Sequence, residues 1–328
     1  MNEPVHIFYH KSDSDGKAAG AVLRYFYGTK NNHVVFMHPF EYGDKFPEGI
    51  DRTSIIVFTD VMVSPYDGMR EVIDNYPNLI LIDHHQSLID WLNENYTNHE
   101  FMGLLMSGRK AACELAWSWC FGYDNIPRFI KLLSAYDVHD LSDNRRWNRE
   151  IYPFQLGMKM KNIDPVDNFE FWKGHIFDLP NEDWIAHKIE QGMVVIEYQR
   201  ALDIRVMQSN AFEAFFDGLR AICCNSTIQN SQAFESVFDP NKHDLMVSFQ
   251  ITKDNKYRVS LYAENHTIDV SKIAVSYGGG GHPGAAGFQS DRMAIRTGQE
   301  THIVFFNLPE VAKFSEEEYE RSDQDGSD

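Results

Sequence analysis

Residues 5–16 read VHIFYHKSDSDG, a short apolar run that ends directly in one histidine and two aspartates. Val5–Tyr9 has the length and the β-branched and aromatic composition of a buried strand. His10, Asp13 and Asp15 therefore stand where a predicted strand ends and the chain turns toward its next element. The segment places candidate metal ligands at the carboxyl end of a strand.

The same arrangement recurs twice in the first half of the chain. Ser54–Thr59 leads into Asp60, and Leu79–Ile82 leads into the tripeptide Asp83-His84-His85. A further strand is predicted at Val34–Met37, and helices are predicted at Ala18–Tyr27, Tyr66–Asn75, Ala111–Cys120 and Ile126–Tyr136. Strands that alternate with helices are typical of a parallel sheet, whose carboxyl strand ends face one crevice. We therefore expect the acids and histidines of these strand ends to meet.

The second half begins with a long helix. An amphipathic pattern from Asn181 to about Met207 predicts one helix that connects two domains. Beyond it, strands are expected at Ala221–Cys224, Leu245–Ile251, Tyr257–Tyr262 and His302–Phe306, and a helix at Ile268–Ser276. The prediction is an α/β protein with a parallel-sheet domain and flanking helices at 1–165, a linker with the connecting helix at 166–209, a smaller α/β domain at 210–312 and an acidic tail at 313–328.

Length and charge limit the function. At 328 residues the chain is long for one compact core and suits two domains. The formal net charge of −18 disfavours extended nucleic acid as a partner, because the chain repels long polyanions. The cysteines form no CxxC pair, the amino terminus has no apolar signal core, and no apolar run approaches the roughly 20 residues of a membrane span. A cytoplasmic location is expected.

The acids and histidines at the strand ends are best explained as a group. For Asp60 taken alone, the commoner interpretation is an N-cap of the following helix. For the whole set, packing without a cation would cost several kcal/mol in repulsion and desolvation. Oxygen and imidazole ligands without thiolate favour Mn²⁺ or Mg²⁺, with Co²⁺, Zn²⁺ or Fe²⁺ as alternatives. The sequence therefore predicts bound divalent cations.

The ordered motifs resemble those of the DHH phosphoesterase superfamily. The matching residues are His10-x-x-Asp13-x-Asp15-Gly16, Asp60, Asp83-His84-His85 and Asp137. The segment Gly278–Gly287, GGGGHPGAAG, resembles the nucleotide-binding signature of the associated DHHA1 domain. The resemblance covers roughly residues 5 to 307. It implies a DHH catalytic domain followed by a DHHA1 substrate-binding domain.

The resemblance implies two divalent cations, most readily Mn²⁺, and assigns their ligands. One ion would be bound by His10, Asp13 and Asp60, and the second by Asp15, Asp60, His84 and Asp137. Asp83 would support a ligand histidine, and His85 would face the substrate phosphate. The candidate substrate contacts are Arg109, Gly279, Gly280, Gly281 and His282. Glycine suits such contacts because its backbone N–H can approach an anion closely.

The implied activity is divalent-metal-dependent hydrolysis of short oligonucleotides or dinucleotides to 5′-mononucleotides by metal-activated water, as in nanoRNases. Two enzymatic alternatives stay open, a cyclic-dinucleotide phosphodiesterase and a RecJ-like single-strand 5′ exonuclease. The pyrophosphatases of the superfamily carry a different second domain. The non-enzymatic alternative is a nucleotide-binding or sensing module. Neither a membrane nor a long duplex is expected as a partner, and the oligomeric state is open, a homodimer included.

Overall fold

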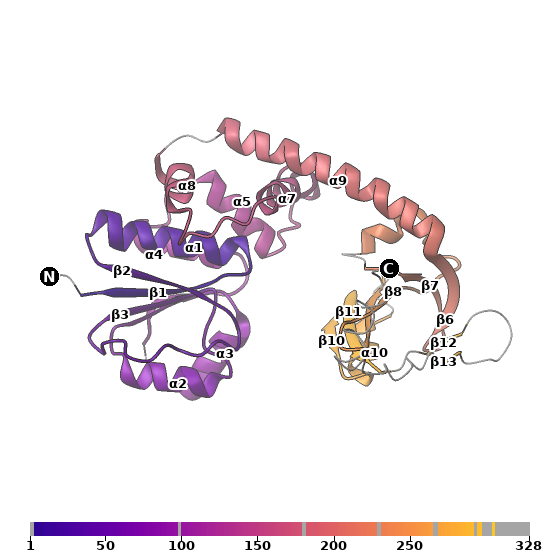
Figure 1. Ribbon diagram of the computed structural model, residues 1–328, viewed down its shortest axis with the longest axis horizontal. Coiled ribbons are helices and arrows are strands. Elements are labelled where there is room, and N and C mark those ends of the chain that lie inside the picture. The colour runs from indigo at the N-terminus through magenta and orange to yellow at the C-terminus, as the bar shows by residue number, and fades with distance from the viewer. Residues whose placement is uncertain are drawn as a thin grey trace, which may run out of the picture. The chain divides into compact units, whose positions relative to one another are not determined.

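The structure, a computed structural model, divides into two compact units, Met1–Glu197 and Tyr198–Asp328 (Figure 1). It describes residues 3–97, 100–178, 182–227, 231–264, 268–291, 294–296 and 304–305. The acidic tail expected at 313–328 lies outside the described residues. Each unit has its own sheet and its own hydrophobic core.

The first unit is built on a five-stranded parallel sheet with the order β2-β1-β3-β4-β5. Its strands are β1 (Val5–His10), β2 (Val35–Phe40), β3 (Ile55–Thr59), β4 (Leu79–Asp83) and β5 (Met102–Leu105). The four strands predicted for this half are confirmed, with small shifts at their ends. The sequence pattern does not indicate β5, because its four residues include Gly103 and become a strand only by pairing with β4.

Helices cover both faces of this sheet, which is why its central strands β3 and β4 are almost entirely apolar. The helices are α1 (Ser14–Arg24), α2 (Tyr66–Asn75), α3 (Gln86–Asn95), α4 (Ala112–Phe121), α5 (Arg128–Asp137), α6 (Asn144–Arg146), α7 (Tyr152–Lys159) and α8 (Phe169–Lys173). Val5 and Ile7 of β1 pack in one core with α1 and α4, whereas Phe8 packs in another core with α2 and α3. Figure 1 shows these two pairs of helices on opposite sides of the sheet.

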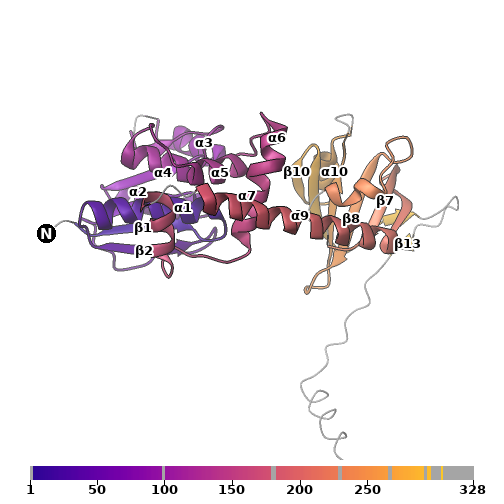
Figure 2. The ribbon, with the colours of Figure 1, turned by 90° about the horizontal axis from the view of Figure 1, so that it is seen from above.

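The connecting helix is α9 (Glu182–Asn210), which Figure 2 shows as one continuous helix. Ile185 packs in the core of the first unit, and Met207 packs in a small core of the second. The predicted first residue, Asn181, lies outside the described residues. None of the described helices has the combination of length and apolar character that crossing a membrane would require.

The second unit contains an eight-stranded mixed sheet with the order β10-β11-β9-β8-β7-β6-β12-β13. Its strands are β6 (Ala211–Phe216), β7 (Leu219–Asn225), β8 (Leu245–Ile251), β9 (Tyr257–Tyr262), β10 (Gly280–His282), β11 (Ala285–Ser290), β12 (Ala294–Arg296) and β13 (Val304–Phe305). β7 and β8 are parallel, and the other neighbouring pairs are antiparallel. α10 (Val270–Ser276) packs on one face, where Val270 contacts the core of the sheet. The unit is the smaller α/β domain that the sequence predicts.

Two features of the second unit differ from the sequence-based expectation, and a third is described only in part. The sequence pattern does not indicate β6, because this strand follows α9 directly without a turn signal. Part of the glycine-rich segment forms β10, since Gly280–His282 pairs with β11. The strand expected at His302–Phe306 is described only at Val304–Phe305, and its other residues lie outside the described part of the chain.

Candidate metal centre

Three strands of the first sheet bring candidate ligands to one edge. His10 is the last residue of β1, Asp60 follows β3 directly, and Asp83 ends β4 just before His84 and His85. Because these strands are parallel neighbours, their carboxyl ends lie together. Three groups of residues have ligand atoms within 4.8 Å of one another: His10, Asp13 and Asp60; Asp15, His84 and Asp137; and Asp60, His84 and His85.

Asp60 lies between histidines of two different strands. Its Oδ2 is 3.5 Å from Nδ1 of His10, and its Oδ1 is 3.3 Å from Nε2 of His84. Asp60 is buried and has a φ of 60°, a left-handed conformation that costs energy for a residue other than glycine. It caps no helix, because α2 begins only at Tyr66 and is preceded by Pro65. The helix-cap interpretation of Asp60 is therefore wrong, and its position fits a carboxylate shared by two ligand groups.

Asp13 both caps a helix and contacts His10. One carboxylate oxygen accepts a hydrogen bond of 2.8 Å from the backbone N–H of Gly16. The other oxygen lies 2.5 Å from Nδ1 of His10. This cap explains why α1 begins at Ser14 rather than at the predicted Ala18. A Cβ on Gly16 would lie 2.5 Å from the carbonyl oxygen of His10, so glycine allows the helix to start this close to the strand end.

Asp15 is a buried acid held by the amino end of α4. Its two oxygens accept hydrogen bonds of 2.8 and 2.9 Å from the backbone N–H groups of Ala112 and Cys113. Burial, followed by the charges of Asp60 and Asp137, raises the pKa of Asp15 well above its usual value. A cation beside these carboxylates would stabilise their ionised forms.

Asp137 belongs to the ligand group around His84. It is the last residue of α5, and its Oδ2 lies 3.2 Å from Nε2 of His84. The nearby acids Asp140 and Asp143 instead accept hydrogen bonds from backbone N–H groups that follow them. Burial and then the charge of Asp60 raise the pKa of Asp137 to about 6. Of the three acids in this segment, Asp137 is the one placed in the ligand groups.

The surroundings of two buried imidazole nitrogens show whether these residues fit a metal ion. Nδ1 of His10 and Nε2 of His84 are buried and face carboxylates, yet neither makes a hydrogen bond of acceptable geometry. The other ring nitrogen of His10, Nε2, lies 2.9 Å from Oε1 of Glu41, so the tautomer that donates to Glu41 leaves a lone pair on Nδ1. Buried imidazole nitrogens beside several carboxylates form a donor set for divalent cations. The residues present therefore fit such ions.

Asp83 orients His85 through two hydrogen bonds that one of its oxygens accepts. One oxygen of Asp83 accepts a hydrogen bond of 2.8 Å from the backbone N–H of His85 and one of 2.7 Å from its Nδ1. The hydrogen bond to Asp83 is the main cause that raises the pKa of His85 to about 9, with burial acting against it. The turn after β4 brings both donors of His85 to one oxygen of Asp83, and the expected support of a ligand histidine by Asp83 stays a prediction. The His85 side chain is 41% exposed and accessible to a substrate.

Glu41 and Tyr42 are two site residues that no motif in the sequence indicates. Glu41 accepts the hydrogen bond from His10, and the ring of Tyr42 lies 5.5 Å from that of His10 and 6.4 Å from that of His85, measured between centroids. Both residues directly follow β2. The available signal is that β2 pairs in parallel with β1, so that its carboxyl end must reach the same edge of the sheet.

A pocket of about 310 Å³ adjoins Asp13 and is rich in lysine. Its lining includes Ser12, Asp13, Lys17, Lys159, Lys161 and Asn162. Lys17 donates a hydrogen bond of 2.8 Å to the side chain of Asn162. Burial and then the charge of Lys161 lower the pKa of the neighbouring Lys188. In a chain of net charge −18, this local excess of positive charge favours an anion.

The predicted substrate contacts lie in both units. Arg109 is exposed in the segment before α4, in the same unit as the metal-ligand candidates. Gly279, Gly280, Gly281 and His282 belong to the second unit, where Gly280–His282 is the exposed strand β10. The metal-ligand candidates are therefore brought together within one unit, whereas the glycine-rich residues are part of the other.

Comparisons with known proteins concern both units. The family model of the DHHA1 domain matches residues 232–301. A curated, uncharacterised protein of Acanthamoeba polyphaga mimivirus is 21% identical over 297 residues, which cover 86% of this chain and 66% of that protein. The chain thus spans just under two thirds of the length of this relative.

Solved structures with similar folds include the DHH domain of a member of the s1p family of ribosomal proteins. It has a TM-score of 0.50 and 11% sequence identity, with 88% of this chain and 82% of that chain covered. The pGpG-specific phosphodiesterase of Vibrio cholerae has a TM-score of 0.47 and 13% identity, with 88% and 93% covered. At these identities the likeness concerns the fold.

The first unit is an α/β domain that carries a cluster of acids and histidines at the carboxyl ends of a parallel sheet, and the second is a mixed-sheet domain with a glycine-rich strand. The family match identifies a DHHA1 domain at residues 232–301, within the second unit. The fold of the chain is similar to that of a solved DHH-domain structure, in agreement with the resemblance of the ordered motifs to the DHH superfamily.

Proposed function

We propose that this chain is a divalent-metal-dependent phosphodiesterase that hydrolyses short oligonucleotides or dinucleotides to 5′-mononucleotides. The observation that carries the proposal is the position of Asp60, whose two oxygens face His10 and His84 from two ligand groups. Two divalent ions held there would supply the positive charge that activates a water and offsets the charge of the attacked phosphate.

Each ligand has a defined part in this proposal. His10 and Asp13 would hold one ion, Asp15, His84 and Asp137 would hold the other, and Asp60 would contribute to both. Glu41 fixes the ring of His10 through Nε2, so that the lone pair of Nδ1 would be available to bind an ion. The backbone N–H groups of α4 hold Asp15 in the same manner. Mn²⁺ or Mg²⁺ suits this set of oxygen and imidazole ligands.

His85 is proposed to contact the substrate phosphate. Its Nδ1 is held by Asp83, which leaves Nε2–H available to donate to a non-bridging phosphate oxygen. The raised pKa of about 9 favours the protonated ring near neutral pH. A positioned donor of this kind stabilises the negative charge that develops during in-line attack.

Charge and the second domain support a short substrate. The net charge of −18 acts against long nucleic acid, whereas the lysine pocket beside Asp13 attracts a small anion. The DHHA1 domain, proposed to extend over 210–312, would hold the nucleotide near the exposed strand Gly280–His282. All four cysteines are free, which supports a reducing cytoplasm as the location.

The experiment that tests this function is a substrate panel in the presence of Mn²⁺. The purified chain and an Asp60→Ala variant are incubated with pGpG, a five-nucleotide RNA, cyclic di-AMP, long single-stranded DNA and pyrophosphate. We expect the intact chain to release mononucleotides from pGpG and short RNA, and the variant to release none.

Other outcomes of the panel would replace the proposal. Preferential turnover of cyclic di-AMP would indicate a cyclic-dinucleotide phosphodiesterase, and processive digestion of long DNA would indicate a RecJ-like exonuclease. If the chain binds nucleotides but hydrolyses none of the substrates, the remaining interpretation is a nucleotide-binding or sensing module.

A further inference from the structure

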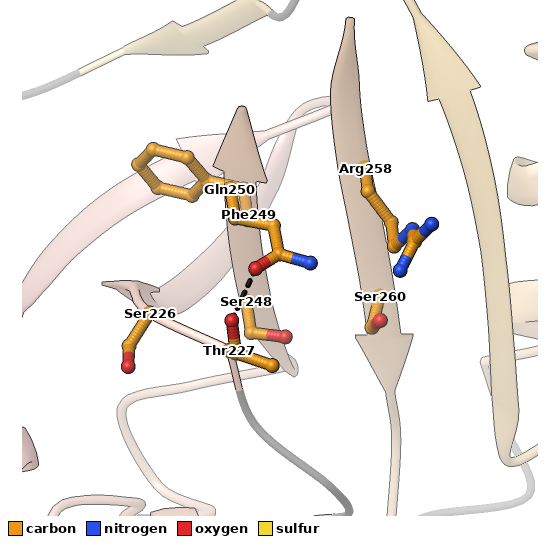
Figure 3. A pocket seen from close by; sticks show the side chains of 7 residues that line it. All are labelled: Ser226, Thr227, Ser248, Phe249, Gln250, Arg258 and Ser260. Carbon is orange, nitrogen blue, oxygen red and sulfur yellow. Dashed lines mark hydrogen bonds between the residues drawn. The ribbon is translucent and has the colours of Figure 1, made fainter. Parts of the chain in front are cut away.

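The second unit carries a small polar pocket on one face of its sheet. The pocket has a volume of about 120 Å³, and Figure 3 shows the side chains that line it. Four of these residues occupy facing positions of two adjacent strands: Ser248 of β8 pairs with Ser260 of β9, and Gln250 pairs with Arg258. Directly paired residues point to the same face of a sheet, so these four side chains converge.

The pocket offers hydrogen-bond donors and one positive charge. Thr227 donates its hydroxyl to Oε1 of Gln250, which occupies the amide oxygen and leaves the amide nitrogen as a donor (Figure 3). Ser248 and Ser260 add two hydroxyls, and the exposed Arg258 adds a guanidinium. None of the lining residues is acidic. Within a chain of net charge −18, this combination selects an anion.

The pocket shares its sheet face with the glycine-rich strand. One row of paired residues crosses the sheet from β8 to β10 and consists of Ser248, Ser260, Gly287 and Gly280. Ala286 and Phe288, the neighbours of Gly287, are buried in the core with α10, so this row lies on the opposite face. Adjacent strands lie about 4.8 Å apart, which puts Gly280 roughly 10 Å from Ser260.

The size of the pocket limits what it can hold. Pockets for whole drug-sized ligands measure about 300–1,000 Å³. A volume of about 120 Å³ therefore admits a phosphate group but not a whole nucleotide. The rest of a nucleotide has room beside the pocket, because Gly287 and Gly280 present no side chain and a Cβ on Gly280 would meet nothing within 4 Å.

We propose that the pocket is a phosphate subsite in which Arg258 binds one phosphate of a nucleotide that extends along the row toward Gly280. Gln250, Ser248 and Ser260 complete the donor set around the phosphate oxygens. A planar guanidinium is suited to phosphate because it can donate two parallel hydrogen bonds. This inference rests on the proposed function for the nucleotide as ligand, but it requires neither the metal ions nor hydrolysis.

The test measures binding of 5′-AMP to the full chain in EDTA by calorimetry. Arg258→Met is compared with Lys253→Met, which removes the same charge from an exposed position in the turn between β8 and β9. We expect Arg258→Met to weaken 5′-AMP binding at least about tenfold, since charge-assisted hydrogen bonds are lost. Lys253→Met should change the affinity for 5′-AMP less than twofold, and Arg258→Lys should retain part of the affinity that Arg258→Met loses. Inorganic phosphate should compete with 5′-AMP.

The outcomes separate this inference from the proposed function. Equal 5′-AMP binding by the intact chain and Arg258→Met, or equal weakening by both methionine variants, would overturn the phosphate subsite. Failure of the intact chain to bind 5′-AMP or phosphate would overturn it as well. If 5′-AMP binding depends on Arg258 but the chain hydrolyses no substrate, the phosphate subsite would be supported and the proposed phosphodiesterase activity would be rejected. Circular dichroism checks that each variant is folded. If Arg258→Met does not fold, the Arg258→Lys variant provides the test instead.

Discussion

Oδ1 of Asp60 lies 3.3 Å from Nε2 of His84, although the two residues follow different strands. Asp60 is also buried and held in a left-handed backbone conformation. In the metal-free chain the protonated ring of His10 faces the buried carboxylate of Asp60, and a bound cation would take over this role. Metal binding and activity should therefore both depend on Asp60.

The substitution Asp60→Asn tests this dependence. Asparagine tolerates a positive φ and matches the size of aspartate, so the variant should stay folded in EDTA. Added Mn²⁺ should raise the unfolding temperature of the intact chain and not of the variant, whose activity should fall more than about 100-fold. The same Mn²⁺-dependent rise in both proteins would contradict a role of Asp60 in metal binding.

Metal binding should release protons. Burial lowers the pKa of His10, but the carboxylates of Asp13 and Asp60 outweigh it and raise that pKa to about 11. A raised pKa means that the metal-free ring is protonated near neutral pH, so an ion binds only as the proton leaves and its affinity increases with pH. Calorimetric titration with Mn²⁺ in two buffers of different ionisation enthalpy should show about one or more protons released per chain. Heats that do not depend on the buffer would argue against His10 as a ligand.

His85 and Asp83 should affect turnover without removing the metal. His85→Ala is expected to lower kcat by about 10²- to 10⁴-fold while the Mn²⁺ content stays unchanged. In the metal-free protein, Asp83→Asn should lower the pKa of His85 from about 9 toward 6.5, because its main cause is the hydrogen bond to Asp83. NMR titration of the imidazole measures this shift. Loss of Mn²⁺ from His85→Ala would instead make His85 a ligand.

The lysine pocket should act on substrate binding. Lys161→Met is expected to raise KM for a short RNA by about three- to tenfold with little change in kcat, because the lysine attracts the substrate and is not among the metal-ligand candidates. Its effect should diminish as the salt concentration increases. Lys131→Met, an equal loss of charge at an exposed position of α5, is the matched control. An equal rise of KM in both variants would show that only net charge matters.

Much of the site could be predicted because the sequence patterns of its strands are easy to recognise. Val5–Tyr9 and Leu79–Ile82 are apolar runs that stop at polar residues, and parallel topology alone brings their ends together. Asp137 could also be chosen among nearby acids, since its place at the end of a helix is visible in the pattern.

Other parts depend on contacts that no local pattern contains. Glu41 reaches His10 only because β2 pairs with β1, and β2 is a weaker pattern that includes Pro39. Asp83 could contact either His84 or His85, and the conformation of the turn after β4 decides that it contacts His85. The pocket of Arg258 depends on the register of β8 and β9, because a shift by one residue would move its side chains to the opposite face.

The most direct test of the account is an anomalous difference map from crystals soaked in Mn²⁺. We expect two peaks about 3.5–4 Å apart, one beside His10 and Asp13 and the other beside Asp15, His84 and Asp137, with Asp60 in contact with both. A map without a peak at this edge of the sheet, or with peaks that Asp60 does not contact, would contradict it.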